Sequence, residues 1–482
     1  MHLIALLVKI IFILNIFVAI ITVFKGKRDI AATWAWLLVL LLLPVIGFIM
    51  YLFVGKKLSR DDIYDIRSQQ QMGLDQLVEL QKEQWHEKDL LPEDELSHSA
   101  REMVHFFLET DHAILTKHNH VELLTDGKQK FEQLFQDIEA AKDHVHIEYY
   151  TFYNDQIGNQ LRKLLEKKAA QGVKVRVIYD SFGSRGTTHE FFKRLEELGG
   201  FAEPFFGSYR SFPNFRLNYR DHRKLVIIDG KIGYIGGFNI GDQYLSRDPK
   251  FGYWRDTHIR IEGNAVIAMQ SRFFMDWNAT VKEKKMTYQE SYFPLSAPKG
   301  RASIQIVSSG PESEVEKIKL GYIKMIGDAH KEVLIQTPYL IPDDSLYETL
   351  CLAAFSGVKV KVMIPSMPDH PFVYRATQYY AHALLENGVE IYQYENGFLH
   401  SKTMVADGKI ASVGSANMDY RSFKLNFESN AFLYDREFSQ QMRATFAEDI
   451  KHSRKLTLAD FKAESRWLKF KQYFSRLLSP IL

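Results

Sequence analysis

The sequence predicts an α/β protein made of two similar sandwich domains, each a mixed sheet flanked by helices, packed face to face and preceded by a two-helix transmembrane hairpin. Three observations predict this class. The chain has 482 residues, enough for more than one domain. Strand-like and helix-like segments alternate over most of it. A pattern of about 180 residues occurs twice, which indicates an internal repeat.

The N-terminal sequence contains two apolar runs that predict membrane-spanning helices. They cover about residues 3–24 and 31–54, and each is long enough to cross a hydrocarbon layer of about 30 Å. A cleaved signal peptide is the alternative for the first run, but Lys56 and Lys57 follow the second run as they would a stop-transfer segment. We therefore expect a transmembrane hairpin over residues 1–58 and a multi-pass protein of the cell membrane.

The orientation of this hairpin does not follow from its charges. Basic residues lie both in the connecting stretch 25–28 and after the second run, so the two sides are nearly balanced. The one cysteine, Cys351, permits no internal disulfide and fits a reducing compartment. We expect the catalytic domains on the cytoplasmic side.

The remaining chain divides into three predicted parts. Residues 59–118 are polar, with apolar residues at helical spacing, which predicts a helical connector leading off the membrane. Short strands and helices then alternate, which predicts one α/β domain over 119–295 and a second over 296–482. The strand GVKVRVI that begins at Gly172 recurs as GVKVKVM from Gly357, as expected for two copies of one fold.

The most specific part of the repeat is a motif that occurs once in each half. Residues 222–239 read HRKLVIIDGKIGYIGGFN, and residues 400–417 read HSKTMVADGKIASVGSAN. One match of this kind is weak, but two in the same register inside a larger repeat are strong. The candidate site residues are His222, Lys224, Asp229 and Asn239 in the first copy and His400, Lys402, Asp407 and Asn417 in the second.

These residue types suit reaction at a phosphodiester. Alternation along a strand places His222 and Lys224 on one face, and His400 and Lys402 likewise. A neutral imidazole can attack as a nucleophile, and an imidazolium can act as an acid near neutral pH. Lysines and asparagine amides can donate hydrogen bonds to phosphoryl oxygens. Two such sets facing each other would surround one phosphodiester, with a histidine on each side for in-line displacement.

No cofactor and no metal are expected. The sequence has no His-Glu-x-x-His motif, no Cys/His cluster and no carboxylate-rich loop with the spacing of a metal site. A lysine two residues after each histidine also opposes the binding of a cation. We expect the lysines to supply the charge that magnesium supplies in other phosphotransfer enzymes.

The duplicated motif resembles the HKD motif of the phospholipase D superfamily, and the whole chain resembles the bacterial cardiolipin synthases. The resemblance includes the second apolar run with its tryptophans, both HKD motifs, the stretches TFYND, WRDTHIRIEG and NFESN, and the terminal RLLSPIL. It implies phospholipase D-like domains that transfer a phosphatidyl group from one phosphatidylglycerol to another through a phosphohistidine, releasing glycerol. It also implies that His222 is the nucleophile and that His400 is the acid and then the base.

Other functions use the same residues. A membrane-bound phospholipase D would hydrolyse the lipid, and a transphosphatidylase would use another acceptor alcohol. A phosphodiesterase or nuclease tethered to the membrane is disfavoured because the net charge of +2 provides no attraction for a polyanion. A noncatalytic scaffold is disfavoured by two intact motifs. The expected partners are phosphatidylglycerol and the lipid bilayer, with no nucleic acid.

Each histidine needs a partner for its second ring nitrogen. The candidates are Asp256 in WRDTH and Glu428 in NFESN, which follow their motifs by similar intervals. In proteins that this chain resembles, the partner tends to come from the opposite half. We therefore expect Glu428 on His222 and Asp256 on His400, the alternative for Asp256 being a salt bridge with its neighbour Arg255.

Two further segments combine cations with apolar residues. The tail from 465 to 482 carries four cations and no acidic residue. This composition predicts either an amphipathic helix lying on an anionic leaflet or a helix packed on its own domain. Segment 209–219 allows the same two interpretations. Because it precedes the first motif, we expect it to form a lip of the active-site entrance.

Overall fold

The computed structural model describes residues 2–25, 30–51, 63–64, 74–86, 98–207 and 218–479. The chain separates into two compact units, one of residues 1–59 with 208–219 and one of residues 60–207 with 220–482. The predicted lip over 209–219 lies almost entirely outside the described residues.

The N-terminal unit is helical. Its helices are α1 (His2–Lys25), α2 (Ile30–Leu42) and α3 (Pro44–Met50). The second predicted span is therefore divided at Leu43, directly before Pro44, whose ring excludes the backbone donor that a continuous helix requires. Within the described part of the chain, no helix combines the length and the apolar character needed to cross a membrane. The predicted transmembrane hairpin is thus not confirmed.

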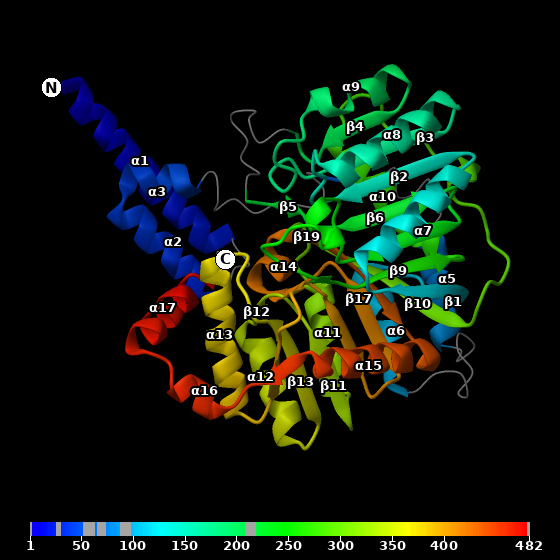
Figure 1. Ribbon diagram of the computed structural model, residues 1–482. Coiled ribbons are helices and arrows are strands. Elements are labelled where there is room, and N and C mark those ends of the chain that lie inside the picture. Colours follow the sequence, from blue (N-terminus) through cyan, green and yellow to red (C-terminus); the bar gives the residue numbers. More distant parts are fainter. Residues whose placement is uncertain are drawn as a thin grey trace. The chain divides into compact units, whose positions relative to one another are not determined.

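The larger unit contains two halves that share a core of seven corresponding strands, to which the second half adds further elements (Figure 1). The strands of the first half are β1 (Thr116–Leu124), β2 (His144–Tyr149), β3 (Lys174–Tyr179), β4 (Phe201–Pro204), β5 (Arg220–Asp221), β6 (Lys224–Ile228), β7 (Ile232–Gly236), β8 (Trp254–Arg255) and β9 (His258–Glu262). Its helices are α7 (Gly127–Ala140), α8 (Gln156–Ala170), α9 (His189–Glu197) and α10 (Ala265–Thr280).

The second half repeats this pattern. Its strands are β10 (Ala302–Ser309), β11 (Glu332–Gln336), β12 (Leu340–Ile341), β13 (Lys359–Pro365), β14 (Glu390–Tyr394), β15 (Phe398–Leu399), β16 (Thr403–Ala406), β17 (Ile410–Gly414), β18 (Met418–Asp419), β19 (Asn426–Leu433) and β20 (Ser453–Lys455). Its helices are α11 (Lys317–Gly327), α12 (Asp344–Phe355), α13 (Pro371–Glu386), α14 (Tyr420–Lys424), α15 (Arg436–Lys451), α16 (Leu458–Lys462) and α17 (Arg466–Leu477).

The sheets confirm that the halves are copies. The first half has the strand order β1-β9-β7-β6-β2-β3-β4, and the second has the matching order β10-β19-β17-β16-β11-β13-β14 with β20 added. In both halves three strands at one side are parallel and the rest antiparallel. Each half is therefore a mixed α/β sheet flanked by helices, as predicted.

The two sheets are also joined, which the prediction of two domains packed face to face did not include. Strands β1 and β10 pair antiparallel, with Thr116 opposite Ile304 and Asn119 opposite Ala302. The halves thus form one continuous path of hydrogen-bonded strands, while β7 also contacts β17 and β19 of the other half. This junction holds the halves in one register, so a site built from both can be rigid.

The predicted connector over 59–118 is partly wrong, because its second helix belongs to the core of the second half. Helix α6 (His98–Asp111) buries Met103, Val104, Phe107 and Leu108 completely. The ring of Phe107 lies 4.5 Å from that of Phe432 in β19. The amphipathic spacing of this segment predicts a helix. It does not show which part of the protein the apolar face of that helix packs against. Helix α5 (Leu74–His86) precedes it.

Candidate active site

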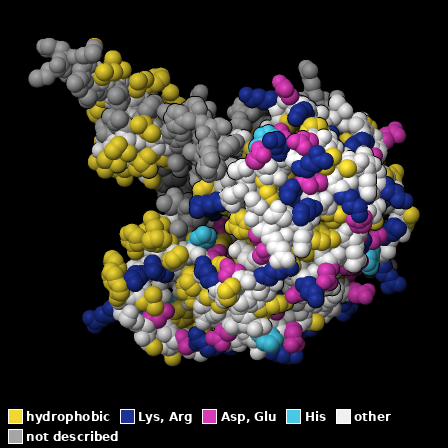
Figure 2. Space-filling model, turned by 45° about the horizontal axis from the view of Figure 1, so that its top comes forward, with side chains coloured by type: hydrophobic (Ala, Val, Ile, Leu, Met, Phe, Trp, Pro, Cys, Tyr) yellow, Lys and Arg dark blue, Asp and Glu magenta, His cyan; other side chains and the backbone are white. Residues whose placement is uncertain are grey.

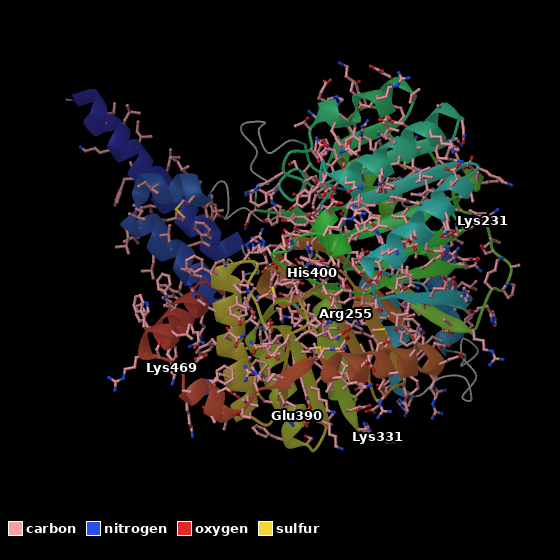
Figure 3. The ribbon with its side chains drawn as sticks, in the orientation of Figure 1. Lys231, Arg255, Lys331, Glu390, His400 and Lys469 are labelled. Carbon is pink, nitrogen blue, oxygen red and sulfur yellow. The ribbon has the colours of Figure 1, made fainter. Side chains whose placement is uncertain are left out.

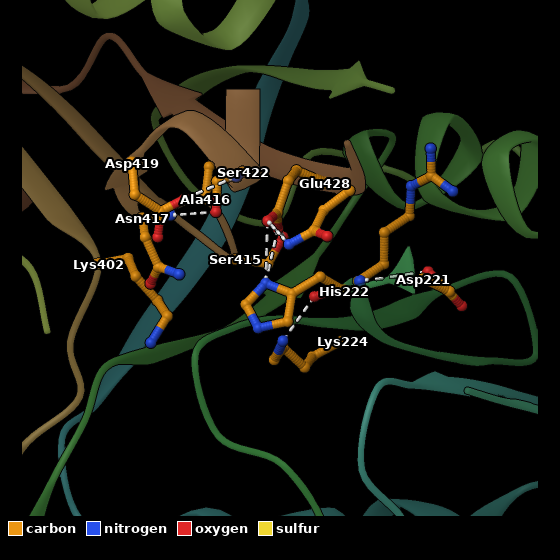
Figure 4. A network of polar contacts seen from close by, with 12 residues as sticks. Asp221, His222, Lys224, Lys402, Ser415, Ala416, Asn417, Asp419, Ser422 and Glu428 are labelled. Carbon is orange, nitrogen blue, oxygen red and sulfur yellow. Dashed lines mark hydrogen bonds and ion pairs between the residues drawn. The ribbon is translucent and has the colours of Figure 1, made fainter. Parts of the chain in front are cut away.

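The first histidine is held by a strand from the opposite half. Strand β5 pairs in parallel with the start of β19, with Asp221 opposite Phe427. His222 therefore follows the paired segment, and its backbone N–H donates to the carbonyl of Phe427 at 2.9 Å. Its Nδ1 lies 2.9 Å and 3.0 Å from the two carboxylate oxygens of Glu428 (Figure 4). Ser415 donates its hydroxyl to Glu428 Oε2 at 2.5 Å, which orients the carboxylate further.

The second histidine is held in the equivalent way, by a strand of the first half. Strand β15 pairs in parallel with β8, with Leu399 opposite Arg255. The N–H of His400 donates to the carbonyl of Arg255 at 2.7 Å, and its Nδ1 lies 2.6 Å from Asp256 Oδ2. The other oxygen of Asp256 accepts the N–H of Thr257 at 2.7 Å. The crossed contacts expected from the sequence, Glu428 on His222 and Asp256 on His400, are therefore both present.

The two lysines reach back toward their own histidines. Lys224 Nζ donates to the carbonyl of His222 at 2.5 Å, and Lys402 Nζ donates to that of His400 at 2.5 Å. Both ammonium groups are buried, and burial lowers the pKa of Lys224 to about 7 and that of Lys402 to about 8. The charge of Lys402 lowers the pKa of Lys224 further, since like charges disfavour each other. The cations of the two halves therefore act on one common site.

Both imidazoles are neutral at neutral pH. Burial, opposed by Glu428, lowers the pKa of His222 to about 4, and burial together with Lys402 lowers that of His400 to about 4. Burial raises the pKa of Glu428, but His222, Lys224 and Ser415 outweigh it and hold the pKa below its usual value. A carboxylate oxygen accepts a hydrogen bond from Nδ1–H, so the free electron pair of each imidazole lies on Nε2.

Aromatic rings lie against both histidines. The ring of Tyr150 lies 5.0 Å from that of His222, and the ring of Trp254 lies 5.2 Å from that of His400. Lys224 Nζ also lies 5.4 Å from the Tyr150 ring. These rings restrict the orientation of each imidazole and contribute to its burial, and burial is the main cause of the lowered histidine pKa values.

The aspartates of the two motifs are not part of this group. The carboxylate of Asp229 accepts the N–H groups of residues 142–144 at 2.8–2.9 Å, and Asp407 accepts those of residues 330–332 at 2.8–3.0 Å. Both occupy left-handed turns, with φ of 52° and 54°. Each lies at the end of β6 or β16 that is remote from its histidine. Their assignment as catalytic residues is corrected: they hold the turn after β6 or β16 to the adjoining strand.

The two asparagines of the motifs differ from each other. The amide of Asn239 is occupied, because Oδ1 accepts the N–H of Thr151 at 3.1 Å and Nδ2 donates to Tyr244 at 3.1 Å. Asn417 instead hydrogen-bonds Asp419, and its Oδ1 has no hydrogen-bond partner in the described part of the chain. Burial raises the pKa of Asp419 to about 6 against the opposing effect of these hydrogen bonds. The two amides therefore make different contacts in the two halves.

Sequence reasoning missed Asp449, on α15. Arg255 donates from Nε and NH2 to the Asp449 carboxylate at 3.0 Å and 2.8 Å, and the amide of Gln336 donates to the same carboxylate at 2.7 Å. The alternative salt bridge between Arg255 and the Asp256 carboxylate is thus not formed. An aspartate on an amphipathic helix carries no local signal that it will face a buried arginine of the other half. Figure 3 shows Arg255 below and to the right of His400.

Gly237 leaves space for the carboxylate of Asp256. Comparison of the two halves does not reveal this role, because the residue at this position differs between them. The corresponding residue of the second half is Ser415, which holds Glu428. A Cβ atom on Gly237 would lie 2.0 Å from Asp256 Oδ1. Any side chain there must displace the carboxylate that contacts His400.

We expect Gly237→Ala to lower kcat roughly 100-fold, because Asp256 can no longer orient His400. The overpacked site should also lower the free energy of unfolding by about 1–3 kcal/mol. Steady-state kinetics and thermal unfolding measure the two effects. Gly327→Ala is the matched control, because its Cβ meets nothing within 4 Å. Full activity in Gly237→Ala would contradict this account of the glycine.

Comparison with known protein families defines the class. A family model described as cardiolipin synthase, PLD-like domain, matches residues 134–262 and again 322–450. A model described as phospholipase D-nuclease N-terminal matches residues 13–56. With a histidine from each half facing a shared pair of lysines, the protein is a phosphatidyltransferase of the phospholipase D type.

Comparison with curated proteins defines the family. The chain is 54% identical to a cardiolipin synthase of Listeria innocua over 482 residues, 100% of both chains. It is 49% identical to the major cardiolipin synthase of Bacillus subtilis over 99% of each chain. It is 46% identical to a cardiolipin synthase of Staphylococcus aureus, over 98% of this chain and 95% of that one. The chain belongs to the cardiolipin synthase family.

A solved structure shares the fold. The phosphatidylserine synthase of Haemophilus influenzae superposes with a TM-score of 0.60, covering 75% of this chain and 95% of that chain, at 15% identity. At this identity the likeness concerns the fold of the paired halves alone.

Proposed function

We propose that this protein condenses two phosphatidylglycerol molecules into cardiolipin and glycerol. The observation that carries the proposal is the crossed site, in which His222 and His400 come from different halves and each contacts a carboxylate of the other half. Such a site offers one nucleophile and one acid to a single phosphodiester. Exchange of one phosphodiester for another needs no nucleotide, and the family membership supports the lipid substrate.

In the first step, His222 Nε2 attacks phosphorus, and the bond from phosphorus to the glycerol headgroup oxygen breaks. His400 gives its proton to that oxygen, so glycerol leaves neutral and a phosphohistidine remains. In the second step, His400 takes the proton of a headgroup hydroxyl on a second phosphatidylglycerol. That oxygen attacks phosphorus, the bond to His222 breaks, and cardiolipin is formed.

The electrostatics of the site support these roles. A neutral His222 whose Nδ1 proton is held by Glu428 has its Nε2 electron pair available for attack. A phosphodiester anion beside the buried lysines favours their cationic forms and also raises the pKa of His400, which must carry a proton to act as the acid. Substrate binding therefore charges the groups that the first step requires.

We also propose that the N-terminal helices hold the enzyme at a membrane, with the two-helix hairpin as the anchor and the larger unit on the cytoplasmic side. Support comes from the apolar sequence of α1, α2 and α3 and from the family model that matches residues 13–56. A donor and an acceptor that are both lipids provide a reason for such an anchor.

Purified protein incubated with phosphatidylglycerol vesicles tests the reaction. We expect cardiolipin and glycerol in equal amounts. Phosphatidic acid with glycerol would show a hydrolase instead, and a new phosphatidyl ester formed only with an added alcohol would show a different acceptor. Either result would replace the proposed function, because all three reactions use the same residues.

Activity is expected to persist in excess chelator. The two buried lysines supply the positive charge near the phosphodiester, so no divalent ion is required for the chemistry. Cardiolipin formation in mixed micelles with and without EDTA measures this. Micelles of neutral detergent are used because divalent ions alter anionic lipid surfaces directly. Complete loss of activity, restored by one particular ion, would contradict the assignment.

The lysine pKa values predict a fall of kcat/KM on the alkaline side. The ammonium forms are needed and are lost as the pH rises through about 7 to 8. The decline of kcat should lie at higher pH, because the bound phosphodiester raises both lysine pKa values and kcat reports the complex. Lys224→Arg should move the decline of kcat/KM upward, since a guanidinium keeps its charge. If kcat/KM declined at the same pH in the wild-type and Lys224→Arg enzymes, the decline would not come from Lys224.

A further inference from the structure

Helix α17 carries an apolar stripe on its outward face. Trp467, Phe470, Phe474 and Leu477 are 63%, 57%, 48% and 73% exposed. Their spacing of three, four and three residues places all four side chains on one side of the helix. Figure 2 shows yellow apolar side chains gathered at the lower left, over the position of α17 in Figure 1.

The opposite face of α17 is polar, and it is the face that packs on the protein. Gln472 and Ser475 are buried against the body of the second half, where α17 contacts α13. Gln472 donates to the carboxylate of Glu464 at 3.0 Å, and the ring of Tyr473 lies 5.4 Å from that of Tyr379 on α13. A surface helix normally buries its apolar stripe. Here the stripe contributes nothing to the core, so its apolar character requires another explanation.

The charges of the helix all have one sign. Its cations are Arg466, Lys469, Lys471 and Arg476, and the helix contains no acidic residue. Lys469 projects away from the body of the larger unit (Figure 3), and the Lys471 ammonium lies 5.2 Å from the Trp467 ring. Cations beside an apolar stripe with aromatic rings are the composition of a helix that lies at the surface of an anionic membrane.

Helix α13, on which α17 packs, follows a loop that influences the active site. Helix α13 begins at Pro371, directly after the loop that contains Asp369. Asp369 accepts the hydroxyl of Tyr339. Burial lowers the pKa of Lys402, and the negative charges of Asp256, Glu428 and Asp369 oppose this effect, in that order of size. A surface bound by α17 is therefore connected to the active site through α13 and the loop before it.

We propose that the exposed face of α17 is a docking surface for an anionic phospholipid leaflet, separate from the N-terminal helices. The aromatic and leucine side chains enter the headgroup region, and Arg466, Lys469 and Lys471 contact lipid phosphates, whereas Arg476 lies over the Tyr379 ring of α13. The inference rests on the proposed function only in that a lipid substrate lies in such a leaflet. A second copy of the chain is a poorer occupant, because a symmetric contact would bring like charges together.

Spin labels on the full-length protein test the docking directly. Cys351→Ser removes the one native cysteine, and Phe470→Cys or Phe474→Cys then carries a nitroxide; Lys451→Cys on α15 is the aqueous control. In vesicles with phosphatidylglycerol, we expect labels at 470 and 474 to collide more often with oxygen than with a water-soluble nickel complex. The control should show the reverse. Aqueous behaviour at both positions, or spin–spin broadening that disappears on dilution with unlabelled protein, would overturn the proposal.

Kinetics provide a second test that separates this inference from the proposed function. Phe470→Asp with Phe474→Asp should lower activity on vesicles at least about tenfold, because even one phenylalanine side chain that enters the leaflet contributes roughly a tenfold preference for the lipid. Activity on short-chain phosphatidylglycerol below its micelle concentration should be unchanged. Leu295→Asp, a site 86% exposed in the first half, is the matched control and should keep vesicle activity. An equal loss on both substrates would reject docking, whereas no activity of the wild-type protein on either substrate would reject the proposed function.

Discussion

His222→Ala and His400→Ala are each expected to lower cardiolipin formation by about 10²–10⁴-fold or more, since each removes either the nucleophile or the proton donor. Neither half holds both groups, so the remaining histidine cannot compensate. Glycerol release and cardiolipin formation in mixed micelles measure the loss. His189→Ala is the control, because the His189 side chain is 78% exposed on α9. If either variant kept more than about a hundredth of the wild-type rate, the result would contradict a single site shared by the two histidines.

A substrate with a good leaving group distinguishes the two histidines. A phosphatidyl nitrophenol loses nitrophenolate without protonation, so it does not need the acid in the first step. His400→Ala should therefore still release nitrophenol in a burst and accumulate a phosphohistidine at position 222. His222→Ala should release none. A burst in His222→Ala, with the phosphate on His400, would reverse the assignment of nucleophile and acid.

Asp256→Asn and Glu428→Gln are expected to lower kcat by about 10²–10⁴-fold while changing KM little. Each carboxylate holds the Nδ1 proton of a histidine from the other half and stabilises the positive charge that develops there in the transition state. An amide keeps the shape but not the charge. Initial rates over a range of surface concentrations of lipid separate kcat from KM.

Asp229→Asn is the control for these two variants. Its carboxylate holds three backbone N–H groups of a distant turn, so the substitution should lower the melting temperature and leave kcat close to that of the wild type. If Glu428→Gln and Asp229→Asn behaved alike, the contact between Glu428 and His222 would be structural and not catalytic.

The sequence predicted the site better than its surroundings, and the reason is the repeat. His222 and His400 stand in the same register, and each is followed two residues later by a lysine, at the start of β6 or directly before β16. The repeat also misled, because the motif aspartates share that register yet serve turns in both halves. Identity of position in two copies does not show whether a residue's role is chemical or structural, and at Asn239 and Asn417 even the contacts differ between the copies.

The junction between the halves could not be predicted from local patterns. Pairing of β1 with β10 joins residues 116 and 304, and neither strand differs in composition from an ordinary core strand. The burial of α6 in the second core has the same origin, since its apolar stripe fits any apolar surface. Gly237 was equally hidden, because only the position of Asp256 shows why a side chain is excluded there.

The exchange of strand partners between the halves has a consequence during protein synthesis. His222 is made early, but Phe427 and Glu428, which bind its backbone and its ring, are among the last segments to be translated. A growing chain that carries the complete first half therefore has neither an oriented nucleophile nor its acid. The crossed architecture postpones all chemistry until the second half has folded onto the first.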